Sequence, residues 1–137
     1  MSQPVTIDAS VFISAFSPAE VAHPQSKAFM RRIHDDSIPI IVPTLVLPEV
    51  ASAIARGQGK PDLGVAFAEE LCSFPNLTLV AVDESLARLS VEIAARHRLR
   101  GSDAVYTAVA LRFGTELVTL DGEQLGRLAG ALTVREP

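Results

Sequence analysis

The sequence contains only one cysteine, Cys72, and no apolar run that approaches the length of a membrane span. A single cysteine excludes an internal disulfide and any zinc site built from a cysteine cluster. A membrane helix requires about 20 consecutive apolar residues, and the N-terminus lacks the basic and then apolar segments of a signal peptide. We therefore expect a cytoplasmic protein without membrane association, with Cys72 as a small buried core residue.

The sequence also lacks an excess of positive charge. Its 12 Lys and Arg residues are outnumbered by 16 Asp and Glu residues, and the net charge of −4 argues against a nucleic-acid binder that relies on bulk charge. Local basic runs occur nevertheless, at Arg96-His97-Arg98-Leu99-Arg100, at Arg31-Arg32, and at Arg56 with Lys60. Each run has an ordinary explanation as a solvated helix end, because cations stabilise helix C-termini.

The sequence does contain a regular alternation of apolar strands and amphipathic helices. Hydrophobic residues make up 48% of the 137 residues, which is enough to bury one sizeable core. The pattern predicts strands near residues 5–8, 38–43, 77–82, 117–120 and 132–134, and helices near residues 24–34, 44–56, 61–74, 83–97, 101–113 and 124–128. This alternation predicts an α/β fold: a single domain over residues 1–137, with a mainly parallel, twisted sheet of four to five strands and helices on both faces.

Four acidic residues fall at or beside the carboxyl ends of these strands. Asp8 ends the first strand, where the chain passes straight into a helical turn, and Asp121 directly follows the fourth strand. Glu49 lies in the first turn or so of the helix after the second strand, and Asp103 opens the helix over residues 101–113. Ligands bind at this edge of open α/β sheets, so the four carboxylates are candidates for one site.

Each acid also has an ordinary explanation when it is taken alone. Asp8 can cap the following helical turn, and Asp103 can complement a helix dipole. Asp121 before Gly122 is a common turn pair, and Glu49 fits an exposed helix position. Together, however, carboxylates that converge among apolar neighbours raise each other's pKa values. A hard cation such as Mg²⁺ or Mn²⁺ relieves that repulsion, and such a site with open coordination positions suits phosphodiester hydrolysis.

Strand alternation adds two hydroxyl groups to this candidate site. If extended geometry persists, Asp8 and Ser10 share one side of the first strand, and Thr119 and Asp121 share one side of the fourth. Ser10 and Thr119 are therefore candidate supporting residues beside the acids. The three histidines of the chain have no ligand-like spacing, and we expect none of them to bind the metal.

The motifs that contain these residues resemble those of the PIN-domain nucleases, which include the toxins of VapBC-type toxin–antitoxin systems. The resemblance covers nearly the whole chain. It rests on Ile7-Asp8-Ala9-Ser10, Pro48-Glu49-Val50, Ser102-Asp103-Ala104-Val105-Tyr106-Thr107-Ala108 and Leu117-Val118-Thr119-Leu120-Asp121. The resemblance implies a three-layer α/β/α sandwich and a Mg²⁺- or Mn²⁺-dependent endoribonuclease that hydrolyses phosphodiester bonds in single-stranded RNA.

The resemblance also assigns roles to individual residues. The catalytic and metal-binding residues that it implies are Asp8, Glu49, Asp103 and Asp121. Ser10 and Thr119 match hydroxyl positions that orient the site, and Glu123 matches either an additional acid of the family or an exposed turn. The family further implies a homodimer and, for its toxin members, a cognate antitoxin that blocks the cleft.

The basic run gains a second interpretation from the resemblance. A single-stranded substrate can be held in a local positive groove even by an acidic protein. Arg96, Arg98 and Arg100 immediately precede the helix that bears Asp103, so they are candidate RNA-binding residues.

Other interpretations of the same acids remain open. A haloacid-dehalogenase-like phosphotransferase would use Asp8 as a nucleophile but usually has a second aspartate where Ser10 stands. A phospho-accepting receiver domain would need a lysine after a late strand, and neither Lys27 nor Lys60 fits. A non-toxin PIN-fold RNA-processing nuclease and a catalytically silent PIN-fold binding or assembly module are the remaining alternatives.

Overall fold

The computed structural model describes residues 3–137, in which strands and helices alternate. The strands are β1 (Val5–Ile7), β2 (Ile40–Pro43), β3 (Leu77–Val80), β4 (Glu116–Val118) and β5 (Val134–Arg135). The helices are α1 (Ala9–Phe16), α2 (His23–Asp35), α3 (Val46–Gln58), α4 (Pro61–Cys72), α5 (Glu84–His97), α6 (Gly101–Phe113) and α7 (Gly122–Arg127).

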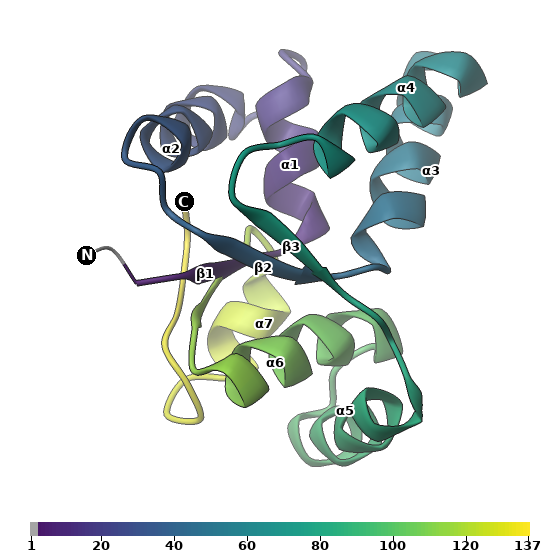
Figure 1. Ribbon diagram of the computed structural model, residues 1–137. Helices are drawn as coiled ribbons and strands as arrows, with labels where there is room; N and C mark the ends of the chain where they lie inside the picture. The colour runs from purple at the N-terminus through teal and green to yellow at the C-terminus, as the bar shows by residue number, and fades with distance from the viewer. Residues whose placement is uncertain (1–2) are drawn as a thin grey trace.

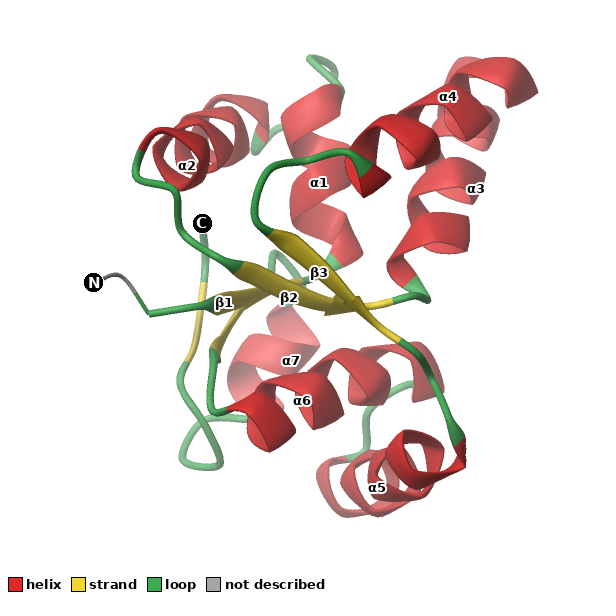
Figure 2. Ribbon diagram, viewed as in Figure 1, coloured by secondary structure: helices red, strands yellow, loops and turns green. Residues whose placement is uncertain are grey.

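The five strands form one sheet in the order β3-β2-β1-β4-β5, and all neighbouring pairs are parallel. Helices α1 to α4 cover one face of this sheet, and α5 to α7 cover the other (Figures 1 and 2). The predicted three-layer arrangement with a mainly parallel sheet is therefore confirmed. No helix within residues 3–137 is long and apolar enough to cross a membrane.

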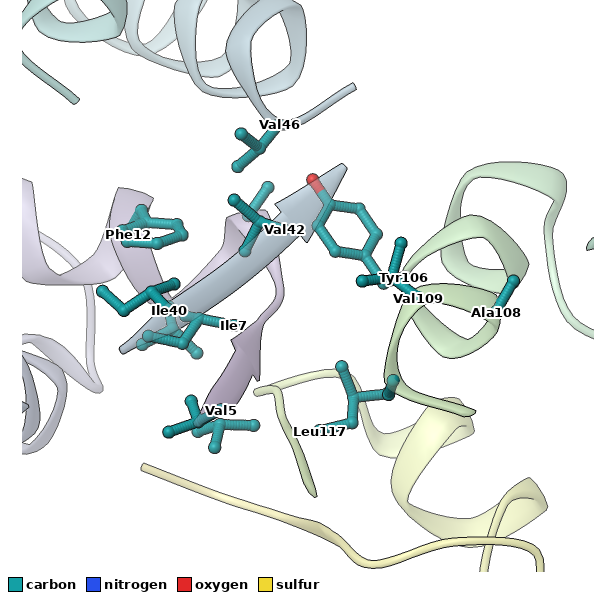
Figure 3. Close-up of a cluster of buried hydrophobic side chains, with 14 of the residues drawn as sticks. Val5, Ile7, Phe12, Ile40, Val42, Val46, Tyr106, Ala108, Val109 and Leu117 are labelled. Carbon is teal, nitrogen blue, oxygen red and sulfur yellow. The ribbon is translucent and has the colours of Figure 1, made fainter. Parts of the chain in front are cut away.

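The central strands are apolar because both faces of the sheet are covered. Val5, Ile7, Ile40 and Val42 are at most 3% exposed, and they pack into one cluster with Leu117 (Figure 3). Each such side chain contributes roughly 1.5–3 kcal/mol when it is removed from water. The core therefore lies along both faces of the central strands. Its packing holds the carboxyl ends of these strands in place.

The order of the strands creates a switch point between β1 and β4. From β1 the chain moves outward to β2 and β3 through α1 to α4, and then returns through α5 and α6 to pair β4 on the other side of β1. Ile7 pairs with Val118, and the backbone N–H of Asp8 donates to the Val118 carbonyl at 2.9 Å. Ligand sites of open parallel sheets lie at such switch points, so the chain after β1 and β4 is where a site is expected.

Several local predictions differ from the structure. Cys72 is exposed and is not a core residue, because α4 buries Gly64 and Leu71 instead. The third strand ends at Val80, and the last strand begins at Val134. Extended geometry also ends at Asp8, so Ser10 reaches its position as a residue of helix α1 and not through strand alternation.

Candidate metal centre

A cleft of about 530 Å³ opens at the carboxyl ends of β1, β2 and β4. All four predicted acids line it. The lining residues are Asp8, Ala9, Ser10, Ile13, Leu45, Pro48, Glu49, Ser52, Ala53, Arg56, Arg100, Ser102, Asp103, Leu120 and Asp121. The sheet edge, helix α3 and the start of helix α6 therefore bring together carboxylates that lie up to 113 positions apart in the sequence.

Asp8 is fixed by the start of helix α1, where it is the N-cap. Its Oδ2 atom accepts hydrogen bonds from the backbone N–H of Ser10 at 3.1 Å and from the Thr119 hydroxyl at 3.3 Å. Asp8 is only 6% exposed. Its Oδ1 atom has no hydrogen-bond partner within residues 3–137, so capping the helix leaves one oxygen of this cleft-lining carboxylate free.

Two hydroxyl groups tie the end of β4 to the end of β1. The buried Thr119 hydroxyl donates to Asp8 and accepts from the backbone N–H of Asp121 at 3.0 Å. The Ser10 hydroxyl accepts from the backbone N–H of Leu120 at 3.2 Å. The two hydroxyls proposed as supporting residues thus hold the two aspartate-bearing segments next to each other.

Glu49 lies in the first turn of helix α3, where its side chain lines the cleft. Its Oε1 atom accepts a hydrogen bond of 2.6 Å from the hydroxyl of Tyr106 on helix α6. Tyr106 is fully buried, and its ring extends beside Val42 of β2 (Figure 3). Partial burial raises the pKa of Glu49, the Tyr106 hydroxyl opposes that rise, and the charge of Asp8 adds to it. Glu49 is therefore directed into the cleft and not into bulk solvent.

Asp103 and Asp121 share one counter-ion. The Arg100 guanidinium donates from Nε to Asp103 Oδ2 at 3.0 Å and from Nη2 to Asp121 Oδ2 at 2.9 Å. The Asp103 side chain is 10% exposed and that of Asp121 is 16% exposed, whereas the Arg100 side chain is 71% exposed. The two acids are thus largely covered, and the arginine that joins them lies at the solvent boundary.

This environment shifts the pKa values of Asp103 and Asp121 in opposite directions. Burial raises the pKa of Asp103 to about 6, against the effect of Arg100 and with the help of the charges of Asp8 and Asp121. Asp121 is also partly buried, but the backbone N–H of Glu123 and the Arg100 guanidinium bring its pKa below the ordinary value. The cleft therefore has more negative charge than its protein partners neutralise.

The donors in the cleft match a hard divalent cation in kind, because Mg²⁺ and Mn²⁺ prefer carboxylate oxygens. Within residues 3–137, however, no three His, Cys, Asp or Glu side chains are arranged as a ready-made metal group. Three of the four acids instead have protein partners: Arg100 bonds Asp103 and Asp121, and Tyr106 bonds Glu49. The donor atoms thus suit a divalent cation in kind, and two of the four acids are bonded to Arg100 in this structure.

The other residues singled out from the sequence lie farther from the cleft. Arg96 is exposed on α5 and pairs with Glu92, while Arg98 ends that helix in a left-handed conformation. Of the basic run, Arg100 lines the cleft and these two arginines do not. Glu123 is exposed, pairs with Arg127 and contributes its backbone N–H to Asp121.

Three residues at or beneath the site were not assigned to it from the sequence. Arg56 lies two helical turns after Glu49 and lines the same cleft. Gln124 is fully buried and donates to the Thr119 hydroxyl at 3.4 Å. The i,i+7 spacing of Glu49 and Arg56 is a signal that would have placed both on one helix face. Tyr106 contacts Glu49 across 57 positions, and no local pattern indicates such a contact.

Comparison with known proteins identifies the family and the fold. The PIN-domain profile matches residues 5–131, and no curated protein is significantly similar in sequence. Among solved structures, VapC20 of Mycobacterium tuberculosis, described as a toxin that cleaves the sarcin–ricin loop, has a TM-score of 0.77 at 19% identity, with 97% of this chain and 99% of that chain covered. VapBC2 of Rickettsia felis, bound to a promoter DNA fragment, has a TM-score of 0.73 at 12% identity, with 98% of both chains covered. FitAcB of Neisseria gonorrhoeae has a TM-score of 0.72 at 16% identity, with 97% of both chains covered. These likenesses show the shared fold, and the profile match shows that the chain belongs to the PIN-domain family.

Proposed function

We propose that the protein is a metal-dependent endoribonuclease that hydrolyses phosphodiester bonds in single-stranded RNA. The proposed ligands of Mg²⁺ or Mn²⁺ are Asp8, Glu49, Asp103 and Asp121. The observation that carries the proposal is that these four carboxylates line one cleft at the switch point of a PIN-domain sheet. An excess of carboxylates over cations there is the charge distribution that a divalent ion completes.

In this proposal, individual residues of the chain have different roles at the metal site. A divalent cation held by these acids would activate a water molecule and stabilise charge on the phosphate oxygens. Asp8 offers its free Oδ1 atom, because its Oδ2 atom is committed to Ser10 and Thr119. Tyr106 restricts the rotation of Glu49. The Thr119 and Ser10 hydroxyls keep the loop after β4 next to the start of α1, so that Asp121 stays beside Asp8.

A local positive rim accounts for substrate binding by an acidic protein. Arg56 and Arg100 line the cleft from helix α3 and from the start of helix α6. Neither arginine is buried, so both are accessible to the phosphates of a single strand. We propose that they bind the RNA backbone near the acids; the candidate roles of Arg96 and Arg98 concern RNA outside the cleft.

The proposed biological role is the toxin of a toxin–antitoxin pair. It rests on the likeness of the fold to VapC20, named as a cleaving toxin, and to a VapBC complex. A toxin–antitoxin complex of Klebsiella pneumoniae has the same fold, with a TM-score of 0.67 at 17% identity and coverage of 95% of this chain and 94% of that chain. A cognate antitoxin that covers the cleft and a homodimeric assembly are part of this proposal.

The test is cleavage of a labelled single-stranded RNA by the purified chain with Mg²⁺ or Mn²⁺. We expect Asp8→Asn and Asp103→Asn to abolish cleavage, and chelation by EDTA to do the same, since each change removes a ligand or the ion. Arg112→Met is the matched control: it lies on α6, outside the cleft, and should cleave like the wild type. Cleavage that survives both substitutions or chelation would exclude the proposed reaction.

One observation favours a second candidate function, a catalytically silent binding module. Arg100 already bonds two of the four acids, so these two carboxylates have a partner without a metal ion. The two candidates separate in a binding experiment. A silent module shows no Mn²⁺ binding by calorimetry, whereas the nuclease binds Mn²⁺ and loses that binding in Asp8→Asn.

A further inference from the structure

Arg100 is placed where it bonds two carboxylates of the proposed metal centre at the same time. Its Nε and Nη2 atoms lie 3.0 Å from Asp103 Oδ2 and 2.9 Å from Asp121 Oδ2. Among the salt bridges within residues 3–137, no other cation joins two acids. A planar guanidinium matches this task, since its donors form a fixed fork. Arg100 therefore differs in kind from the other exposed arginines.

From this geometry we propose that Arg100 is an internal counter-ion that competes with the divalent cation for Asp103 and Asp121 and thereby sets the metal affinity of the centre. The inference rests on the proposed metal-dependent function and goes beyond it. An oxygen atom that accepts a hydrogen bond from a guanidinium is a weaker ligand for a metal ion, so a cation that binds through these two oxygen atoms would displace the side chain of Arg100.

The construction of helix α6 allows this displacement without unfolding. Arg100 is the N-cap residue of α6, but its capping role is performed by its backbone, whose carbonyl accepts from the N–H of Ala104 at 3.0 Å. The side chain makes no capping hydrogen bond and is 71% exposed. The guanidinium can therefore leave the carboxylates while the helix start and Asp103 stay in place.

The other charges that face the guanidinium favour its position in the metal-free protein. Asp8 and Glu49 line the same cleft as Arg100 and its two bonded aspartates, so the cleft holds four carboxylates. Arg56, which lines the cleft from α3, makes no ion pair within residues 3–137 and so does not take its place. Removal of Arg100 would leave Asp103 and Asp121 without a counter-charge until a metal ion binds.

The test is calorimetric titration of Mn²⁺ into the full metal-free chain. We expect Arg100→Met to tighten the dissociation constant about 5-fold, or about 1 kcal/mol, because the ion no longer has to displace a bonded cation. Arg100→Lys keeps the positive charge but loses the forked donors of the guanidinium. Its Mn²⁺ dissociation constant should therefore lie between those of the wild type and Arg100→Met. Arg56→Met removes a charge from the same cleft without removing a bond to the acids, and should change the constant less than 2-fold.

Thermal unfolding distinguishes competition from a structural role. In EDTA, Arg100→Met should unfold below the wild type, because two adjacent carboxylates lose their shared partner. With saturating Mn²⁺ the two melting temperatures should converge, since the metal replaces Arg100 in both proteins. If Arg100 had a structural role alone, Arg100→Met would lower the melting temperature by the same amount in EDTA and in saturating Mn²⁺.

The outcomes separate this inference from the proposed function. If Asp8→Asn and Asp103→Asn lose Mn²⁺ binding but Arg100→Met binds Mn²⁺ no more tightly than the wild type, then Arg100 does not compete with the cation. The proposed metal centre is supported in that case. If neither the wild type nor Arg100→Met binds Mn²⁺, the metal centre and the competition are both wrong. Tighter binding by Arg100→Met, with little change in Arg56→Met, supports the inference.

Discussion

At the scale of single residues, the hydroxyl of Tyr106 has one identifiable task, which is to hold Glu49. Tyr106→Phe keeps the buried ring and removes only the 2.6 Å hydrogen bond. We expect the variant to lose about 1.5–3 kcal/mol of stability in urea unfolding, because a hydrogen bond to a charged group is lost. We also expect about 10-fold weaker Mn²⁺ binding, the usual effect of losing a group that orients a ligand.

The neighbouring residue supplies the control for Tyr106→Phe. Thr107 is also fully buried on α6, but its hydroxyl donates to the backbone carbonyl of Asp103 and not to a carboxylate. Thr107→Val should therefore lower stability while Mn²⁺ affinity stays near that of the wild type. Equal loss of affinity in both variants would mean that Tyr106 acts only through packing.

Asp103 gives the metal-free protein a defined pH dependence. Its pKa is about 6 in the fold and about 3.9 in an unfolded chain, so the folded state binds the proton more tightly. The stability contributed by that proton is present below about pH 4 and is lost as the pH rises through about 6. Compared with Asp103→Asn, the wild type in EDTA should lose about 1–2 kcal/mol over this interval. This is less than the roughly 3 kcal/mol that two pKa units represent, because the paired Arg100 is exposed to solvent. Parallel stability curves from pH 4 to 7 would contradict the shift.

At the scale of elements, the packing of α4 on α3 positions the helix that bears Glu49. Gly64 of α4 lies against α3 so closely that a Cβ atom would be 2.4 Å from the Ala51 carbonyl oxygen and 3.2 Å from the Ala55 Cβ. Gly64→Ala must therefore push the helices apart, and we expect a loss of about 1–3 kcal/mol. Gly57 also lies in α3, and a Cβ atom added there would have no other atom within 4 Å, so Gly57→Ala should instead gain about 0.4–1 kcal/mol. Thermal unfolding of both variants measures the difference.

The elements also show which parts of the fold a sequence specifies. Apolar runs and helix periodicity indicated each long helix, because those patterns reflect burial that the layers of the fold require. The predicted start of the helix near residue 83 agrees with the structure, where the Asp83 carboxylate caps α5 by accepting from the N–H of Leu86 three residues on. Cys72 was misplaced because an apolar local context does not tell which face of α4 is covered. Strand ends differed by one or two residues, where pairing with a neighbour and not local propensity decides.

At the scale of the whole molecule, the location of the site followed from topology and its internal partners did not. Parallel strands end at one edge, so acids that follow β1, β2 and β4 could be placed together from the sequence alone. The bond from Arg100 to Asp121 spans 21 positions and that from Tyr106 to Glu49 spans 57. Such pairs depend on how α6 lies across the sheet, which periodicity within a single helix does not encode.

Net charge and local charge make opposite predictions for RNA binding, and the salt dependence of affinity decides between them. The chain has a net charge of −4, so bulk electrostatics repel RNA, while Arg56 and Arg100 line the cleft. Two phosphate contacts on a single strand give a slope of about −1.4 for log affinity against log salt. A non-cleavable single-stranded RNA analogue, titrated with Mn²⁺ present, should give this slope for the wild type and about −0.7 for Arg56→Met. A slope near zero in the wild type would mean that the cleft arginines do not bind phosphate. A slope several times steeper would locate the RNA on a wider basic surface, and Arg96 and Arg98 would then be the first residues to substitute.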